Sequence, residues 1–211
     1  MNHRLRFGSG ELVITTQRLM ARFPDETAWN AWELAPDLAL SHHDHAGVGT
    51  LELRDATGFT VAFSQMEPGG MRILDMVRSE QPVVIVTRPG ALLDFHASAQ
   101  GKIALAFGDA RLGEAPLRQW TTETLTDPVA LAEEVEAARK RGWAEAPNQT
   151  LAGVTAVAAP VFDMTAGFVA TLTISGPTNT IGSPPDPTYV EAVSAAARKI
   201  SKNLGNTDQV T

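Results

Sequence analysis

The chain has 211 residues, 44% hydrophobic and 19% charged, which is typical of a folded globular protein. Its formal net charge of −7 argues against direct nucleic-acid binding by this chain, because binding to phosphates requires a basic face. The lack of cysteine excludes a disulfide framework and a thiol nucleophile, and no apolar run is long enough to span a bilayer, so we expect a cytoplasmic protein without membrane contact.

The first residues are predicted to form a helical arm. Residues 10–23 carry apolar side chains at a loosely helical spacing, and Pro24 ends the pattern. Few other apolar residues lie nearby to share a core, so we expect this helix to pack on another subunit or domain. Residues 24–45 are less regular and are interpreted as an insertion or loop.

A cluster at the end of this loop is the candidate for a metal site, formed by His42, His43, Asp44 and His45. Neighbouring residues point in different directions on a helix or a strand, so the four side chains converge on one ion only in a loop built for it. A solvated loop is the simpler interpretation. We therefore expect no metal, no cofactor and no catalytic residue, with a His/Asp metal-dependent enzyme as the less favoured alternative.

The middle of the chain is predicted to begin with a helix over residues 50–56 and a β-hairpin. Phe59–Gln65 and Met71–Val77 alternate as strands do, and the turn signal Pro68-Gly69-Gly70 lies between them. Val83–Val86 reads as a further short, buried strand.

Residues Phe95–Phe107 are predicted to form a helix whose first turn holds only small side chains. The unpaired N–H groups and positive dipole end of a helix start can receive an anion, and small residues let a ligand approach the backbone. Ser98, Ala99 and Gln100 are the natural contacts, although close helix packing explains small residues equally well. Gly101-Lys102 lacks the other residues of a nucleotide-binding phosphate loop, which excludes that motif.

The rest of the chain predicts a helix, a second hairpin and a final helix. Asp127-Pro128 and Asp186-Pro187 each supply a cap residue and a proline for the first helical position, and Gly142 and Gly205 mark the ends of the two helices. The charged residues of the first of these helices are interpreted as a solvated surface. Residues 206–211 look frayed.

The second hairpin joins residues 154–160 to residues 168–177 through a short turn containing Gly167. In its second strand, alternate positions form two sets. Phe168, Ala170, Leu172 and Ile174 suit packing against helices, whereas Val169, Thr171, Thr173 and Ser175 end in two hydroxyls that suit a wall hydrogen-bonding a ligand. The alternative is a half-buried strand in which threonine is present for its β propensity.

Several segments resemble the effector-binding domain of IclR-type transcriptional regulators, over about Ala46 to Gly205. The matching motifs, in order, are Phe95-His96-Ala97-Ser98-Ala99-Gln100-Gly101-Lys102, Leu125-Thr126-Asp127-Pro128, Lys140-Arg141-Gly142-Trp143, Ala156-Val157-Ala158-Ala159-Pro160-Val161-Phe162-Asp163 and Thr173-Ile174-Ser175-Gly176-Pro177. His3-Arg4-Leu5 is similar to the end of that family's DNA-binding wing. The resemblance implies that the winged helix-turn-helix would lie before Met1.

The resemblance further implies an α+β, GAF-like domain, a central antiparallel sheet with helices on both faces, preceded by the helical linker arm. Together with the helix start, it gives a ligand pocket formed by Ser98, Ala99, Gln100, Ala156, Thr173, Ser175, Ile85 and Leu93. Two departures concern the ligand. Ala146 stands where some members have an acidic residue, and Gln100 stands where members have glycine or alanine.

The sequence therefore predicts a ligand-sensing, non-enzymatic domain. Its expected parts are a linker over residues 1–23, a loop over 24–45, the effector-binding domain over 46–205 and a tail over 206–211. A small organic effector, a carboxylate or aromatic acid, would modulate operator binding by a winged-helix domain absent from this chain, within a homodimer or homotetramer. A stand-alone sensor or dimerisation module is the alternative.

Overall fold

The computed structural model describes residues 3–7, 10–14, 18–22, 30–33, 57–79, 87–113 and 116–207. The chain divides into two compact units, Met1–His42 and His43–Thr211, and each is described by itself. The predicted helix over residues 50–56, the predicted strand Val83–Val86, the cluster His42–His45 and most of the tail lie outside the described residues.

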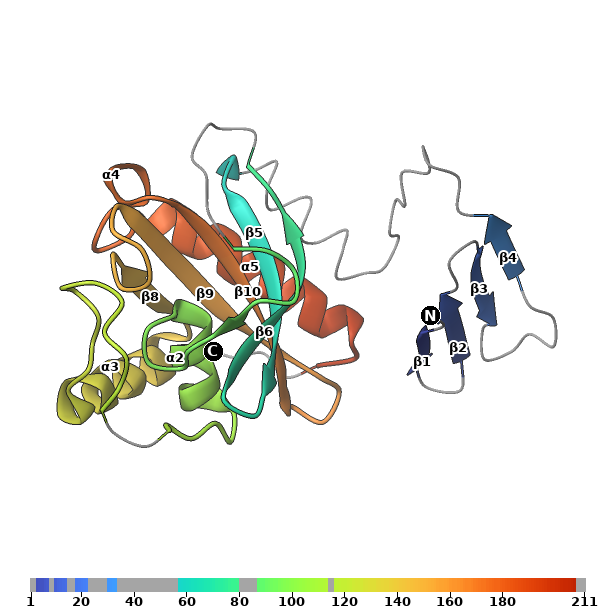
Figure 1. The fold of residues 1–211 in the computed structure, drawn as a ribbon, viewed down its shortest axis with the longest axis horizontal. Coiled ribbons are helices and arrows are strands. Elements are labelled where there is room, and N and C mark those ends of the chain that lie inside the picture. The colour runs from blue at the N-terminus through green and yellow to red at the C-terminus, as the bar shows by residue number, and fades with distance from the viewer. Residues whose placement is uncertain are drawn as a thin grey trace. The chain divides into compact units, whose positions relative to one another are not determined.

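The first unit is a four-stranded antiparallel sheet in the order β1-β2-β3-β4 (Figure 1). Its strands are β1 (His3–Phe7), β2 (Gly10–Ile14), β3 (Arg18–Arg22) and β4 (Asn30–Glu33). The predicted helical arm over residues 10–23 is therefore wrong. Short apolar runs such as those in residues 10–23 fit a strand as well as a helix. Pairing with neighbouring strands, such as that of Leu12 with Leu5 and Ala21, stabilises the strands here.

The second unit is built on a six-stranded antiparallel sheet in the order β7-β6-β5-β10-β9-β8. The strands are β5 (Thr60–Glu67), β6 (Gly70–Val77), β7 (Leu92–Leu93), β8 (Ala144–Pro147), β9 (Val154–Phe162) and β10 (Phe168–Pro177). The helices are α2 (Ala99–Phe107), α3 (Pro128–Arg141), α4 (Thr178–Ile181) and α5 (Pro187–Asn203). Both predicted hairpins are confirmed, and β7, β8 and α4 are additional elements.

Helices cover both faces of this sheet, which confirms the predicted α+β arrangement (Figure 1). On one face, α5 packs its Val193, Ala197 and Ile200 against a core that includes Leu172 and Ile174. On the other face, α2 and α3 meet β8 and β9 through a cluster composed largely of alanine, namely Ala99, Ile103, Ala106, Ala138, Ala144, Ala146 and Ala158. The small side chains bring α2 close to the sheet.

One predicted alternation fails at the start of β10. The register between β9 and β10 shifts between Phe168 and Ala170, as in a β-bulge. Phe168 consequently packs on the α2 side, and Val169 packs with the α5 side, the reverse of the prediction. A bulge adds one residue to a strand and so reverses the faces of the residues before it. From Ala170 onward the predicted faces are confirmed.

Helix α3 begins at the predicted Asp-Pro pair. The Asp127 carboxylate accepts a hydrogen bond of 2.8 Å from the N–H of Ala130, and Gly142 ends the helix in the left-handed conformation. We expect Asp127→Ala to lower the free energy of unfolding by about 1 kcal/mol, because it removes the cap acceptor. Urea denaturation measures this loss. Asp109→Ala, at an exposed loop position, is the control, and an equal loss there would contradict the capping role.

Candidate functional site

The start of α2 leaves two backbone donors available. Ser98 is its N-cap: its hydroxyl accepts from the Gly101 N–H at 3.1 Å and donates to the Asp94 carbonyl at 2.8 Å. The Lys102 N–H donates to the Ser98 carbonyl at 3.1 Å. Because these bonds occupy the Ser98 hydroxyl and the third and fourth N–H groups, those of Ala99 and Gln100 remain for a ligand.

The sheet opposite this helix start presents small and hydroxyl-bearing residues in cross-strand rows. Ser175 pairs with Ala156 on one side and Thr60 on the other. Thr173 pairs with Ala158, which belongs to the alanine cluster that includes Ala99 of α2. Paired residues share a face of an antiparallel sheet, so the hydroxyls of β10 lie on the α2 side.

The structure therefore brings most of the predicted site residues to one side of the sheet. These are Ser98, Ala99, Gln100, Ala156, Thr173 and Ser175. Leu93 lies instead in the edge strand β7, with β6 and β5 between it and β10. Ile85 lies outside the described residues. Ala146 packs in the alanine cluster.

Sequence reasoning missed a fully buried polar residue on this face, Ser64 of β5. Ser64 pairs with Thr171, and its side chain is fully buried. Among the described residues its hydroxyl has no hydrogen-bond partner, and neither has that of Thr173, which is 1% exposed. The alternation Thr60, Ala62, Ser64 along β5 is the sequence signal that could have found it.

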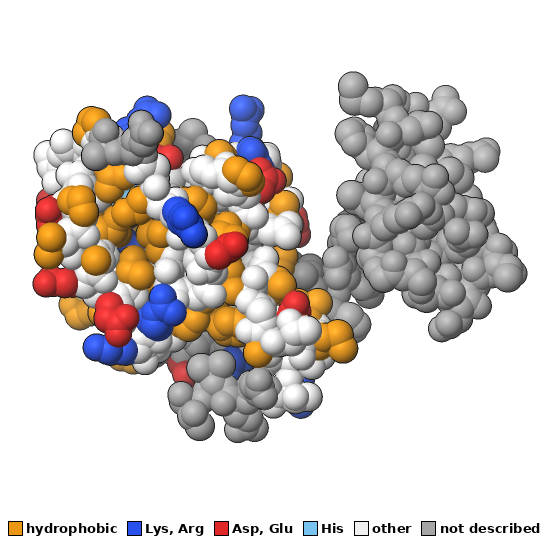
Figure 2. All heavy atoms as spheres, turned by 90° about the horizontal axis from the view of Figure 1, so that it is seen from below, with side chains coloured by type: hydrophobic (Ala, Val, Ile, Leu, Met, Phe, Trp, Pro, Cys, Tyr) orange, Lys and Arg blue, Asp and Glu red, His pale blue; other side chains and the backbone are white. Residues whose placement is uncertain are grey.

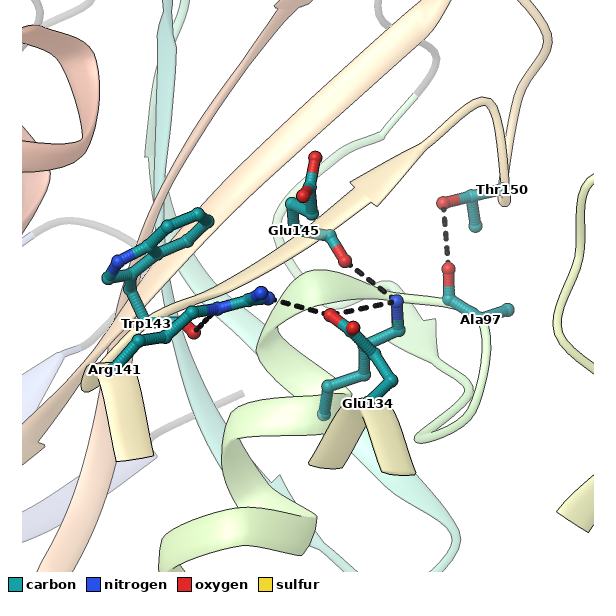
Figure 3. Close-up of polar contacts among 7 residues, drawn as sticks. Ala97, Glu134, Arg141, Trp143, Glu145 and Thr150 are labelled. Atoms are coloured by element: carbon teal, nitrogen blue, oxygen red, sulfur yellow. Dashed lines mark hydrogen bonds and ion pairs between the residues drawn. The ribbon is translucent and has the colours of Figure 1, made fainter. Parts of the chain in front are cut away.

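A partly buried polar cluster around the buried Lys102 ties α2 to α3 and β8 (Figure 3). The Lys102 ammonium donates to the Glu145 carbonyl at 2.7 Å and lies 4.0 Å from the Glu134 carboxylate. Arg141 donates to that same carboxylate at 2.6 Å and to the Trp143 carbonyl at 2.8 Å. Glu134 and Arg141 thus depart from the solvated surface predicted for α3.

Burial governs the electrostatics of this cluster. It lowers the pKa of Lys102 from 10.5 to about 8, more than the neighbouring Glu134 and Glu145 raise it. Burial likewise raises the pKa of the Glu145 carboxyl, against the effect of Arg141. The Lys102 ammonium is already engaged by the Glu145 carbonyl. The predicted ligand residues that the structure places on this side of the sheet carry no ionisable side chain.

Two adjoining cavities lie elsewhere, between the β5–β6 turn and the loop after α2. Their volumes are about 360 and 320 Å³, and both are lined by Gly69, Phe95 and Arg111. Neither includes a predicted ligand residue. Figure 2 shows a face of the second unit on which hydrophobic side chains are interspersed with basic and acidic ones.

Within residues 57–79, 87–113 and 116–207, no group of three or more His, Asp or Glu side chains is placed to hold a metal ion. None of the helices there combines the length and apolar character that a membrane span requires.

Known proteins are similar to this chain in sequence. The family model for the bacterial transcriptional regulator IclR C-terminal domain matches residues 43–202. The chain is 30% identical over 154 residues to the HTH-type transcriptional regulator BhcR of Paracoccus denitrificans, covering 71% of this chain and 55% of that protein. It is 26% identical over 168 residues to the regulator KdgR of Dickeya chrysanthemi, covering 77% and 55%. The chain thus spans about half the length of these relatives.

Solved structures of IclR proteins also match this chain. The Thermotoga maritima IclR structure matches with a TM-score of 0.71 and 30% identity, over 77% of this chain and 68% of that chain. An IclR homologue of Microbacterium hydrocarbonoxydans, complexed with 4-hydroxybenzoate, shares the fold with a TM-score of 0.67 and 23% identity, over 76% and 66%. This chain belongs to the IclR family of bacterial transcriptional regulators and carries the family's C-terminal domain.

Proposed function

We propose that this domain senses a small organic carboxylate, which binds between the start of α2 and the hydroxyl face of β10. The observation that carries the proposal is the pair of N–H groups of Ala99 and Gln100 left available by the Ser98 cap, with Ser175 and Thr173 on the facing strand.

These groups suit a carboxylate. Two backbone N–H groups at the positive end of a helix and the Ser175 hydroxyl each donate to an anionic oxygen, and charge-assisted bonds of this kind are the stronger class of hydrogen bond. Ala99 and Ala156 supply little bulk, so a ligand can approach the backbone closely. A cationic side chain is therefore not required for recognition.

Binding at this site would regulate transcription through a change in the arrangement of the regulator's subunits. A ligand shifts a two-state equilibrium only by the difference between its affinities for the two states. We propose a homodimer or homotetramer as the assembly, and contact with operator DNA through a winged-helix domain of the regulator rather than through this acidic domain.

The test is isothermal titration calorimetry, after a thermal-shift screen, with pyruvate, glycerate, propionate, benzoate and 4-hydroxybenzoate. We expect at least one of them to bind, and Ser175→Ala with Thr173→Val to weaken that binding by about 10- to 100-fold, the effect of losing hydrogen bonds to a charged group. Thr165→Ala, in the β9–β10 turn at the opposite end of the hairpin, is the matched control. Unchanged affinity in the Ser175 and Thr173 variants would place the ligand elsewhere.

A further inference from the structure

The strand register of the first unit places its residues on two faces. Paired residues of an antiparallel sheet lie on the same face, and successive residues of a strand lie on opposite faces. One face, called the apolar face below, carries two successive rows of apolar residues: Ile14, Leu19 and Trp32 in one, and Leu5, Leu12 and Ala21 in the other. The polar residues His3 and Asn30 of this face lie at its margins, in the edge strands β1 and β4.

The opposite face carries charged residues. One of its rows joins Arg6, Glu11 and Arg22, so charges of opposite sign occupy paired positions in neighbouring strands, an arrangement that stabilises a sheet. The adjoining row of this face is mixed and pairs Arg4 with Val13. Antiparallel sheets commonly have one solvated face and one covered face, and this composition makes the apolar face the one that needs a cover.

The described residues of the first unit supply no layer to cover the apolar face. All of them, within residues 3–33, belong to the one sheet (Figure 1). Residues 34–42, with Pro36 among them, are too few to form a second layer over four strands. Chains shorter than about 40 residues usually need disulfides, a metal or oligomerisation to fold, and the sequence has no cysteine. A layer from outside the unit is therefore required, because an apolar sheet face must be buried against another layer.

A second copy of the same sheet matches this face. Two identical sheets have the same twist and pack face to face about 10 Å apart, and a two-fold axis brings the same face of each together. Identical faces can meet only where like charges do not oppose each other. The apolar face contains no Asp, Glu, Lys or Arg, whereas the arginines of the opposite face would repel their own copies.

The size of the face is sufficient for such an interface. The sheet has three strands of five residues and one of four, so it measures roughly 17 by 19 Å. Two such faces packed together remove on the order of 1,000 Å² of accessible surface, the size at which a specific interface begins. The resulting pair of layers contains about 80 residues, which is enough to fold without disulfides.

We propose that the first units of two chains pack their apolar faces together as a two-layer β-sandwich, so that this unit is an interface between copies of the protein. The interface lies outside residues 43–202, which match the family's C-terminal domain. It goes beyond the proposed function and requires neither the effector nor the site at α2. Folding and association of the unit are one event, because the apolar face is covered only in the pair.

Sedimentation equilibrium of the full chain tests the interface with two substitutions in β2. Leu12→Glu places a carboxylate on the apolar face of each chain, and an unpaired charge buried there should raise the dissociation constant of this association by about 100-fold or more. Val13→Glu, one residue further along and on the opposite face, should leave the constant within about threefold. If the second units also associate, Leu12→Glu should halve the assembly rather than dissolve it. An unchanged assembly in Leu12→Glu, or equal losses in both variants, would overturn the inference.

Limited trypsin digestion at a series of protein concentrations gives a second measurement, which includes the parent protein and so does not depend on a variant that folds. Cleavage of the parent at Arg18 and Arg22 of β3 should slow by about tenfold or more as the concentration rises through the dissociation constant, because the unit folds only when it is paired. Leu12→Glu should be cleaved rapidly at every concentration, and Val13→Glu should follow the parent. A parent protein cleaved as fast as Leu12→Glu at the highest concentration, or a Leu12→Glu protein as resistant as the parent, would overturn the inference.

Discussion

Replacing Gly101 with alanine is expected to lower the free energy of unfolding of the second unit by about 3 kcal/mol or more. A Cβ atom at this position would lie 2.4 Å from the Phe95 carbonyl oxygen and 2.5 Å from the Phe95 Cα. Both are backbone atoms, so no side-chain rotation relieves the overlap. Alanine also improves helix propensity by about 1 kcal/mol over glycine, a gain too small to offset the clash.

Urea denaturation measures this effect, and Gly113→Ala is its control. A Cβ at Gly113 meets no atom within 4 Å, so this variant should differ from the parent by less than about 0.5 kcal/mol. The same close approach holds residues 95–98 against the start of α2, so Gly101→Ala should also weaken effector binding. A Gly101→Ala protein as stable as the parent would show that residues 95–98 can move away from α2 without a cost in stability.

The stability of the protein is expected to rise relative to that of Lys102→Met as the pH increases from about 8 to 10.5. Burial lowers the pKa of Lys102 in the folded state from 10.5 to about 8. Between these values the unfolded chain binds a proton that the folded chain does not, so the stability rises with pH in this window. Below pH 8 the folded protein carries the full cost of the buried charge, which is about 3 kcal/mol from the same shift.

Chemical denaturation at several pH values between 7 and 11 measures the difference between the two proteins. Methionine has a similar length and fills the space without a charge, so the rise should be absent in Lys102→Met. Lys140→Met is the control, because the Lys140 side chain is 75% exposed. Parallel stability curves for the parent and Lys102→Met would contradict the assignment of the rise to Lys102.

The first unit shows where prediction from sequence failed. Its apolar residues occur in runs of two or three, which fit a helix and a strand equally well. The choice was made by pairing, such as that of Leu12 with Leu5 and Ala21, and no local signal announces those partners. By contrast, the β5–β6 and β9–β10 hairpins were predictable because glycine-containing turns separate alternating segments.

Some residues of the candidate site were likewise predictable from sequence, and others were not. The helix start at Ser98 and the hydroxyls of Thr173 and Ser175 were found from sequence, because a small-residue turn and a strand alternation are both local patterns. Ser64 was missed, because its importance depends on lying opposite Thr171, more than 100 residues away in the chain. The sequence around Lys102 likewise does not indicate that a carbonyl 43 residues away holds its ammonium group.

The sequence by itself determined the elements whose signals span a few residues: the aspartate caps of α3 and α5, the hairpin turns and the hydroxyl face of β10. Tertiary structure alone decided which residues meet. Burial between α2, α3 and β8 gave Lys102 its lowered pKa. The pairing of β5 with β10 left the hydroxyls of Ser64 and Thr173 enclosed, without hydrogen-bond partners in the part of the chain that the structure describes. The physical reason is that desolvation and long-range pairing depend on what packs around a group, and residues distant in sequence supply that packing.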